Sequence, residues 1–476
     1  MQQLSWTDDM MLRAETPATP LQIQMLLIYD PSTAPGGKVT FKGILEELDG
    51  RLHLADVFRR RLTELPGGFD RPYWVDDPSF DLEYHVRHIG LPQPGDWRQL
   101  CIQVARLHAR QIDLRRPPWE ITVIEGLNAI PGVPKGSFAM ALKLHHCAVD
   151  GMASVQMIAA MHDLAADSPR PAAPNSPWHA APLPTTANLM WNTAIKAALY
   201  PVRASTVLAS SVPKVVRGLA GLPGQLVRGA SRAAEVGGPS FPPKTRFNQT
   251  VTPHRVFEAR FHDLADFKRI KARVPGSTVN DVALAYVGGA LRQYLDGHGE
   301  LPDESLVAAC PISLRDAGDS GKGNVLFGRL QTLGTDIADP LERLTSIAAS
   351  TAGSRSESGH STRTQVIELI GTVPTSLLGV AAKAARGLPL SGPTVANTTV
   401  TNVPGPAEPI YFAGAQLLQA AGLGPLIGGV NLIHVVASYN GILSIGATAD
   451  RNALPDPATY AECMEHAFED LLSCSG

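Results

Sequence analysis

The chain has 476 residues, too many for one ordinary hydrophobic core, and at roughly 150 residues per domain it allows two or three domains. Hydrophobic residues make up 44 % of the chain and charged residues 18 %, which supports buried cores and excludes a disordered chain. The net charge of −3 excludes a globally basic nucleic-acid binder, though not a local basic patch.

Cysteine usage and the amino terminus indicate the compartment. The five cysteines are scattered and form no CxxC pair, which favours a reducing cytosol over a disulfide framework or a zinc ribbon. The first residues lack the basic and apolar regions of a signal peptide. We therefore expect a soluble, cytoplasmic protein.

Hydrophobic periodicity predicts alternating helices and strands in the first half of the chain. The expected strands are 21–29, 119–125 and 138–145. The expected helical segments are 41–62 with an interruption at Gly50, 96–111, and 152–167. After residue 168 a proline-rich stretch without acidic residues predicts an extended linker to residue 184.

A second alternating region begins near residue 254. Strands are expected at 256–261, 306–314, 325–333, 395–401, 429–438 and 442–448, and helices at 263–273, 278–294 and 456–473. The weakly polar run 417–437 contains five helix breakers, which predict a turn leading into a buried strand rather than a membrane span. The predicted organisation is an N-terminal domain (1–167), a linker (168–245) and a C-terminal domain (246–476).

The segment from Ser137 to Gly151 carries the strongest chemical signal. Its residues up to His145 alternate as in a strand, so a continued strand would place His146 on the apolar face and His145 on the opposite one. The two histidines are therefore expected to have different roles. Asp150 and Gly151 stand at the entrance to the next helix, where aspartate can cap the helix and glycine permits a tight turn.

This His-His-x-x-x-Asp-Gly motif resembles the active-site motif of CoA-dependent acyltransferases with a chloramphenicol-acetyltransferase-like fold, which include peptide-synthetase condensation domains. Further segments match in order and together resemble the bacterial wax ester synthase/acyl-CoA:diacylglycerol acyltransferase family. They are Arg116-Pro-Pro-Trp119, Asn280-Asp281, Pro311-Ile-Ser-Leu-Arg315, Gly323-Asn324 and Asn402-Val-Pro-Gly-Pro406. The first of these departs from the family's Pro-Leu-Trp motif at Pro118.

The resemblance implies a fold of two such α/β domains with mixed sheets, arranged as a pseudo-dimer, with a channel between them that meets at His146. It implies an O-acyltransferase that moves a long-chain acyl group from acyl-CoA to a fatty alcohol or diacylglycerol, giving wax ester or triacylglycerol. Histidine, with an ordinary pKa of about 6.5, suits the role of general base, so no metal and no cofactor beyond the acyl-CoA substrate is expected. Motifs for other nucleophile or phosphate chemistry (GxSxG, HExxH, GxxxxGK[ST]) are missing from the sequence.

The catalytic motif leaves alternatives open for its other members. We expect His145 to be structural, through a hydrogen bond to neighbouring backbone. In similar proteins the aspartate equivalent to Asp150 mainly holds the loop against an arginine, and Arg315 is the candidate partner here. Cys147 beside His146 is interpreted as a buried, inert cysteine rather than a nucleophile.

The remaining motif residues have both binding and structural interpretations. Asn280 is a candidate for lining the acyl or alcohol channel. Asp281 either contacts substrate or forms a capping box with Thr278. Trp119 is a candidate for substrate binding and, more simply, a packing residue. The last motif, which contains Asn402, Pro404 and Gly405, predicts a rigid turn. This turn either packs the two halves together or contacts substrate.

Two other functions compete with this interpretation. The first is transfer to another hydroxyl acceptor such as a polyketide, and the second is a non-catalytic lipid-droplet scaffold, which would need neither His146 nor Gly151. The sequence leaves the acceptor, the acyl chain length and the oligomeric state open, although a two-domain chain already supplies both walls of such a channel.

The segment 168–234 predicts a membrane partner. It carries seven Lys and Arg residues and no Asp or Glu, interleaved with apolar and aromatic residues. Such a segment suits an anionic membrane surface, which predicts peripheral association with the inner membrane or lipid droplets. The alternative is a basic linker packed along the acidic domains. Nucleic-acid binding is not expected, because no recognition fold accompanies the charge.

Overall fold

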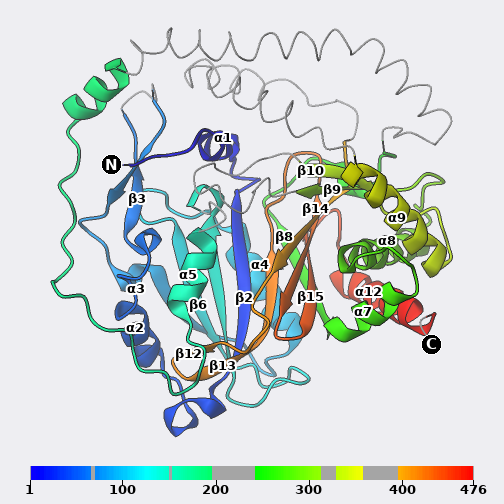
Figure 1. Cartoon of the computed structure of the whole chain (residues 1–476), viewed down its shortest axis with the longest axis horizontal. Coiled ribbons are helices and arrows are strands. Elements are labelled where there is room, and N and C mark those ends of the chain that lie inside the picture. The colour runs from blue at the N-terminus through cyan, green and yellow to red at the C-terminus, as the bar shows by residue number, and fades with distance from the viewer. Residues whose placement is uncertain are drawn as a thin grey trace.

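A computed structural model describes residues 2–65, 70–148, 153–195, 242–311, 328–356 and 395–474. Within these residues the chain forms two six-stranded mixed sheets and a small third sheet, with helices on the outer faces (Figure 1). The expected α/β class with mixed sheets is confirmed.

The first large sheet has the strand order β12-β13-β2-β7-β6-β5, and its neighbouring strands are antiparallel except for β5 and β6. Its strands are β2 (Gln22–Asp30), β5 (Val86–Gly90), β6 (Trp119–Glu125), β7 (Phe138–His145), β12 (Tyr411–Phe412) and β13 (Ala415–Leu423). Every residue of β7 is buried, because the strand lies between β2 and β6 and both faces of the sheet are covered. The small third sheet consists of β1 (Gln2–Gln3), β4 (Tyr73–Asp76) and β3 (Arg60–Thr63).

Different partners cover the two faces of the first sheet. Helices α2 and α5 bury one face, and α4 buries the other together with strand β8 of the second sheet (Figure 1). The helices of this half are α1 (Trp6–Ala14), α2 (Phe41–Asp49), α3 (Leu82–His85), α4 (Trp97–Ala109) and α5 (Ala153–Met161). Helix α4 begins with a capping box between Asp96 and Gln99, as its acidic start suggests.

The second large sheet has the order β10-β9-β11-β14-β15-β8. Its strands are β8 (Arg255–Asp263), β9 (Val307–Pro311), β10 (Gly328–Thr332), β11 (Thr398–Pro404), β14 (Leu432–Tyr439) and β15 (Ile442–Asp450). The helices that pack on its outer face are α7 (Leu264–Ala272), α8 (Val279–Gly297), α9 (Pro340–Ser356) and α12 (Pro457–Ser473). Helix α8 lies at the centre of this core, and most of its residues are buried.

Strands β12 and β13 come from the C-terminal half of the chain but belong to the first sheet. Strand β13 pairs with β2 from Gln416 opposite Asp30 to Leu423 opposite Gln24. The membership of the two sheets therefore does not follow chain order, and the domain boundaries drawn from the sequence stay a prediction.

The weakly polar run 417–437 comprises most of β13, a turn and most of β14. The predicted turn and the buried strand after it are confirmed, and the run begins with a further strand that was not predicted. Among the described residues, none of the helices has both the length and the apolar composition that a membrane span requires.

Most predicted elements of the first half are confirmed, with two corrections. In the helical prediction 41–62, the helix to Asp49 and its interruption at Gly50 are confirmed. Beyond Gly50 only the short 3-10 turn Asp56–Phe58 is helical, and residues 60–63 form strand β3 instead. The helix predicted to reach residue 167 ends at Met161. Residues 168–184 contain neither helix nor strand, as expected for a linker, whereas most of the basic segment that follows (196–234) lies outside the described residues.

The two large sheets come into close contact at glycines, which have no side chain to hold the strands apart. A Cβ atom built on Gly446 of β15 would lie 2.4 Å from the carbonyl oxygen of Gly422 on β13. A Cβ atom on Gly422 would in turn lie 2.4 Å from Cγ1 of Val435 on β14. This close approach brings the C-terminal sheet against the strand that completes the N-terminal sheet.

We expect Gly446→Ala to lower the free energy of unfolding by about 1–3 kcal/mol, because the new methyl group overlaps backbone that cannot move aside without separating the sheets. Gly428→Ala is the matched control, since a Cβ atom there has no neighbour within 4 Å. Urea denaturation of both variants measures the difference. Equal stabilities would show that the sheets do not depend on this contact.

Candidate active site

The histidine pair lies where β7 ends and a short turn, η4 (His146–Ala148), begins. The backbone N–H of His145 donates to the carbonyl of Pro118 at 2.9 Å, and that of His146 donates to the carbonyl of Leu21 at 2.9 Å. Because the strand stops at His145, strand alternation does not set the direction of the His146 side chain. The condition on which the sequence-based assignment of faces depended is not met.

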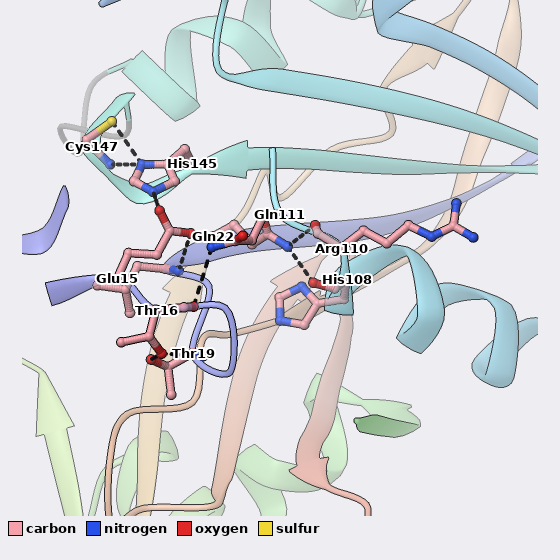
Figure 2. A network of polar contacts seen from close by, with 10 residues as sticks. Glu15, Thr16, Thr19, Gln22, His108, Arg110, Gln111, His145 and Cys147 are labelled. Atoms are coloured by element: carbon pink, nitrogen blue, oxygen red, sulfur yellow. Dashed lines mark hydrogen bonds and ion pairs between the residues drawn. The ribbon is translucent and has the colours of Figure 1, made fainter. Parts of the chain in front are cut away.

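His145 is fully buried and both of its ring nitrogens have partners (Figure 2). Its Nδ1 accepts a hydrogen bond from the backbone N–H of Cys147 at 3.2 Å, and its Nε2 lies 3.1 Å from Oε2 of Glu15. An Nδ1 that accepts must be unprotonated, so Nε2 carries the hydrogen and donates to the carboxylate. The expected hydrogen bond to neighbouring backbone is present.

Glu15 is the residue that sequence reasoning missed. It follows the last residue of α1, and its Oε1 accepts from the backbone N–H of Leu21 at 3.3 Å. A glutamate at a helix end is common, and no motif or period connects position 15 with position 145. Nothing in the sequence pattern marked it out.

His146 is half-buried in the turn, whereas Cys147 and Ala148 are buried. Desolvation lowers the pKa of the His146 ring to about 4, against the opposing effect of a hydrogen bond with the residue's own backbone. Positive charge on His145 would lower this pKa further. The ring is therefore neutral near pH 7 and able to accept a proton.

Cys147 is buried next to the histidine pair, with its Sγ atom 2.9 Å from Nδ1 of His145. Burial raises the pKa of its thiol well above the ordinary value, and the nearby carboxylates of Asp8 and Glu15 raise it further. It packs with Leu4 and Leu62 in a small apolar cluster. These surroundings suppress the thiolate and fit the interpretation of an inert cysteine.

Lys143 shares the α4-facing side of β7 with His145. Its Nζ atom lies 2.9 Å from a carboxylate oxygen of Glu120 and donates to the carbonyls of Leu107 and Arg110. Burial lowers the pKa of this lysine, and the Glu120 carboxylate opposes that effect. The buried positive charge of Lys143 is therefore paired with the carboxylate of Glu120 on the neighbouring strand.

Trp119 is fully buried in β6 beside the end of β7. Its Nε1 donates to the carbonyl of Phe58 at 3.0 Å, and its ring stacks on that of His85 with centroids 4.5 Å apart. The preceding Pro118 carbonyl holds the backbone of His145. The structure thus gives Trp119 a packing role, and its contact with substrate stays a prediction.

Asn280 and Asp281 lie at the start of α8, with Asn280 half-buried and Asp281 fully buried. The capping box predicted from the spacing of Thr278 and Asp281 is present. The second carboxylate oxygen of Asp281 accepts from the hydroxyl of Thr351 on α9 at 2.8 Å. Asp281 therefore joins two helices, and the substrate contact of either residue stays a prediction.

Asn402 and Pro404 lie at the exposed end of β11, which extends three residues beyond the predicted strand. The turn begins at Gly405, whose backbone N–H donates to the carbonyl of Ser438 at 2.9 Å. A Cβ atom on Gly405 would lie 2.3 Å from that oxygen, so only glycine fits. This contact with β14 lies within the second sheet.

Asp150, Gly151 and Arg315 lie outside the described residues, so the predicted loop contact between Asp150 and Arg315 stays a prediction. A hollow of about 390 Å³ lies between the halves and is lined by Gly132, Phe261, His262, Asp263, Leu418, Gln419 and Ile442. The β13 residues in this lining pair near the end of β2 that lies away from His145.

Comparison with known families matches both halves of the chain. Residues 4–283 match the wax ester synthase/diacylglycerol acyltransferase catalytic domain, and residues 322–472 match the C-terminal domain of the same family. A relative in Mycobacterium tuberculosis (strain CDC 1551 / Oshkosh), named as a diacylglycerol O-acyltransferase, is 32 % identical over 475 residues, covering 100 % of this chain and 91 % of its own. Another from strain ATCC 25618 / H37Rv is 31 % identical and covers 98 % of each chain.

Solved structures agree with this result. The wax ester synthase/diacylglycerol acyltransferase from Marinobacter aquaeolei VT8 has a TM-score of 0.69 at 25 % identity, with 100 % of both chains covered. The starter condensation domain of rhizomide synthetase RzmA, solved as a mutant in complex with C8-CoA and Leu-SNAC, shares the fold. Its TM-score is 0.51 at 13 % identity, covering 100 % of this chain and 94 % of its own. The expected fold is confirmed.

We expect Asp281→Ala to lower the free energy of unfolding by about 1–3 kcal/mol, because the cap is lost and the hydroxyl of Thr351 loses its acceptor. Asp296→Ala, at an exposed position near the other end of α8, is the matched control. Thermal or urea unfolding measures both. An unchanged stability together with a raised KM for either substrate would instead indicate that Asp281 contacts substrate.

Proposed function

The chain belongs to the wax ester synthase/diacylglycerol acyltransferase family, and we propose that it moves a long-chain acyl group from acyl-CoA to a fatty alcohol or diacylglycerol. The product is a wax ester or a triacylglycerol. The observation that carries the mechanism is the desolvated His146 ring, which is neutral near pH 7 because burial lowers its pKa to about 4.

His146 acts as the general base in this proposal. A ring nitrogen takes the hydroxyl proton of the alcohol while the alcohol oxygen forms a bond to the thioester carbonyl carbon. The tetrahedral intermediate then collapses, the carbon–sulfur bond breaks, and the proton on His146 passes to the departing CoA thiolate. The histidine ends the cycle neutral, and the protein forms no covalent bond to the acyl group.

Acyl-CoA and the alcohol enter a channel between the two halves from opposite sides. Support comes from the fold, which a condensation domain solved with C8-CoA shares. The rival functions are transfer to another hydroxyl, such as that of a polyketide, and a scaffold without catalysis. A scaffold has no need for a desolvated histidine with a lowered pKa at the end of a central strand.

We expect His146→Ala to reduce turnover by about 10²–10⁴-fold, because the alcohol then has no base at the point of attack. The assay incubates the purified protein with palmitoyl-CoA and a panel of long-chain alcohols, diacylglycerol and polyketide alcohols, and detects the free CoA thiol. Retention of more than half of the activity would contradict the mechanism.

The matched control is His162→Gln. His162 is a buried histidine of the first half whose pKa burial likewise lowers to about 4, but it bonds to Tyr29 and the carbonyl of Ile158. This variant should lose stability and keep its catalytic rate. In the wild type, kcat/KM should stay level as the pH falls from 7 to about 5 and decline only as it passes through about 4, where His146 becomes protonated. A decline centred near pH 6.5 would contradict the desolvated base.

The protein works at an anionic lipid surface in this proposal, peripherally attached to the inner membrane or to lipid droplets. A helix at 186–195 supports it: Leu189 is 4 % exposed and packs with Leu65 and Tyr73, whereas Met190 is 58 % and Trp191 69 % exposed. The docked helix thus presents apolar side chains outward directly before the basic segment. Aromatic and basic groups of this kind favour a lipid interface.

Flotation with anionic vesicles tests the lipid contact. The wild type should float at low salt, because each basic group near such a surface contributes at most about 1 kcal/mol of attraction. It should be released as the salt concentration rises, because salt screens this attraction. A variant changes four basic residues of the segment to glutamine: Lys214, Arg217, Arg228 and Arg232. This variant should be released from the vesicles at a lower salt concentration than the wild type.

The apolar contribution has its own pair of variants. Trp191→Ala should weaken flotation, whereas Trp178→Ala should have a smaller effect, because Trp178 is only 38 % exposed and its ring is already engaged by the Arg59 guanidinium at 4.7 Å. Flotation of the glutamine variant equal to that of the wild type would place the membrane contact elsewhere on the protein.

A further inference from the structure

Glu15 is joined to the turn that carries His146 by two routes. Along the first, its Oε2 binds the Nε2–H of His145, whose Nδ1 accepts from the N–H of Cys147 within the turn (Figure 2). Along the second, its Oε1 accepts from the N–H of Leu21, whose carbonyl accepts from the N–H of His146. A single carboxylate therefore closes a ring of hydrogen bonds that contains the imidazole of His145 and the backbone N–H of His146.

The first route depends on one tautomer of His145. The backbone N–H of Cys147 in the turn is a hydrogen-bond donor, so the Nδ1 atom of His145 must be unprotonated to accept from it. The carboxylate of Glu15 keeps the ring proton on Nε2. Without the carboxylate the ring can carry its proton on Nδ1, where two N–H groups would face each other. The turn would then have to move. A displacement of about 1 Å at a reacting group can cost on the order of 10²-fold in rate.

We infer that Glu15 is a positioning residue for the acyl transfer: by holding His145 and the Leu21 peptide, it fixes the place of the His146 ring without touching the substrates. The inference rests on the proposed function of His146 as the base. It also gives the first histidine of the motif a defined role, because His145 links the Glu15 carboxylate to the turn. Glu15, directly after helix α1, thereby belongs to the active-site scaffold.

Kinetics distinguish positioning from mere stabilisation. Glu15→Ala should lower kcat about 10–100-fold while the KM for palmitoyl-CoA stays within about two-fold. Glu15→Gln keeps one acceptor oxygen and should recover part of kcat. The matched control is Asp9→Asn, which breaks the 2.9 Å ion pair with Arg13 on the same helix and leaves the ring of hydrogen bonds intact. It should lower the melting temperature without lowering kcat.

A measurement without substrate completes the test. In protein labelled with ¹⁵N-histidine, His145 (assigned with His145→Asn) should show a protonated Nε2 and a bare Nδ1. In Glu15→Ala its shifts should move toward a mixture of tautomers, whereas in Asp9→Asn they should not.

An unchanged tautomer and an unchanged kcat in Glu15→Ala would overturn the inference. So would a loss of kcat in Asp9→Asn as large as that in Glu15→Ala. Wild-type protein that transfers palmitoyl groups to none of the acceptors would instead overturn the proposed function, while the tautomer measurement still decides whether Glu15 controls His145.

Discussion

Complete burial of β7 is the constraint on which the rest of the site depends. A strand covered on both faces must consist of apolar residues or of polar residues with dedicated partners, because an unpaired buried polar or charged group costs several kcal/mol. Strand β7 carries Lys143 and His145 on one face, and each has a carboxylate: Glu120 from the neighbouring strand and Glu15 from the end of α1. The polar network around the histidine pair follows from this requirement.

Burial continues in part into the turn after β7, where His146 is half-buried and Cys147 is buried. Removing water from His146 disfavours its charged form, so the ring rests as a base near neutral pH, while at Cys147 it disfavours the thiolate. One physical effect thus favours a neutral histidine and an unreactive thiol side by side. This environment fits the proposed role of His146 as the base.

The sequence predicts those parts of the structure that short-range chemistry decides. Alternation gave the bounds of β7 correctly, and the spacing of Thr278 and Asp281 predicted a helix cap that is present. Alternation failed at His146, because a period-two rule has no meaning once the backbone leaves the strand. The contact of Glu15 with His145 joins residues 130 positions apart, and the pairing of β13 with β2 joins residues nearly 400 positions apart. No local pattern encodes such pairings.

The exchange of β13 between the halves has a consequence for biosynthesis. A ribosome completes β2 and β7 long before it reaches residue 415, so the nascent N-terminal sheet has an open edge at β2 throughout most of translation. Exposed edges of this kind pair readily with other chains, and a chaperone or the growing chain itself must shield this one. The N-terminal sheet is therefore completed only after residue 423 has been made, although the strands and contacts around the histidine pair all come from the first 150 residues.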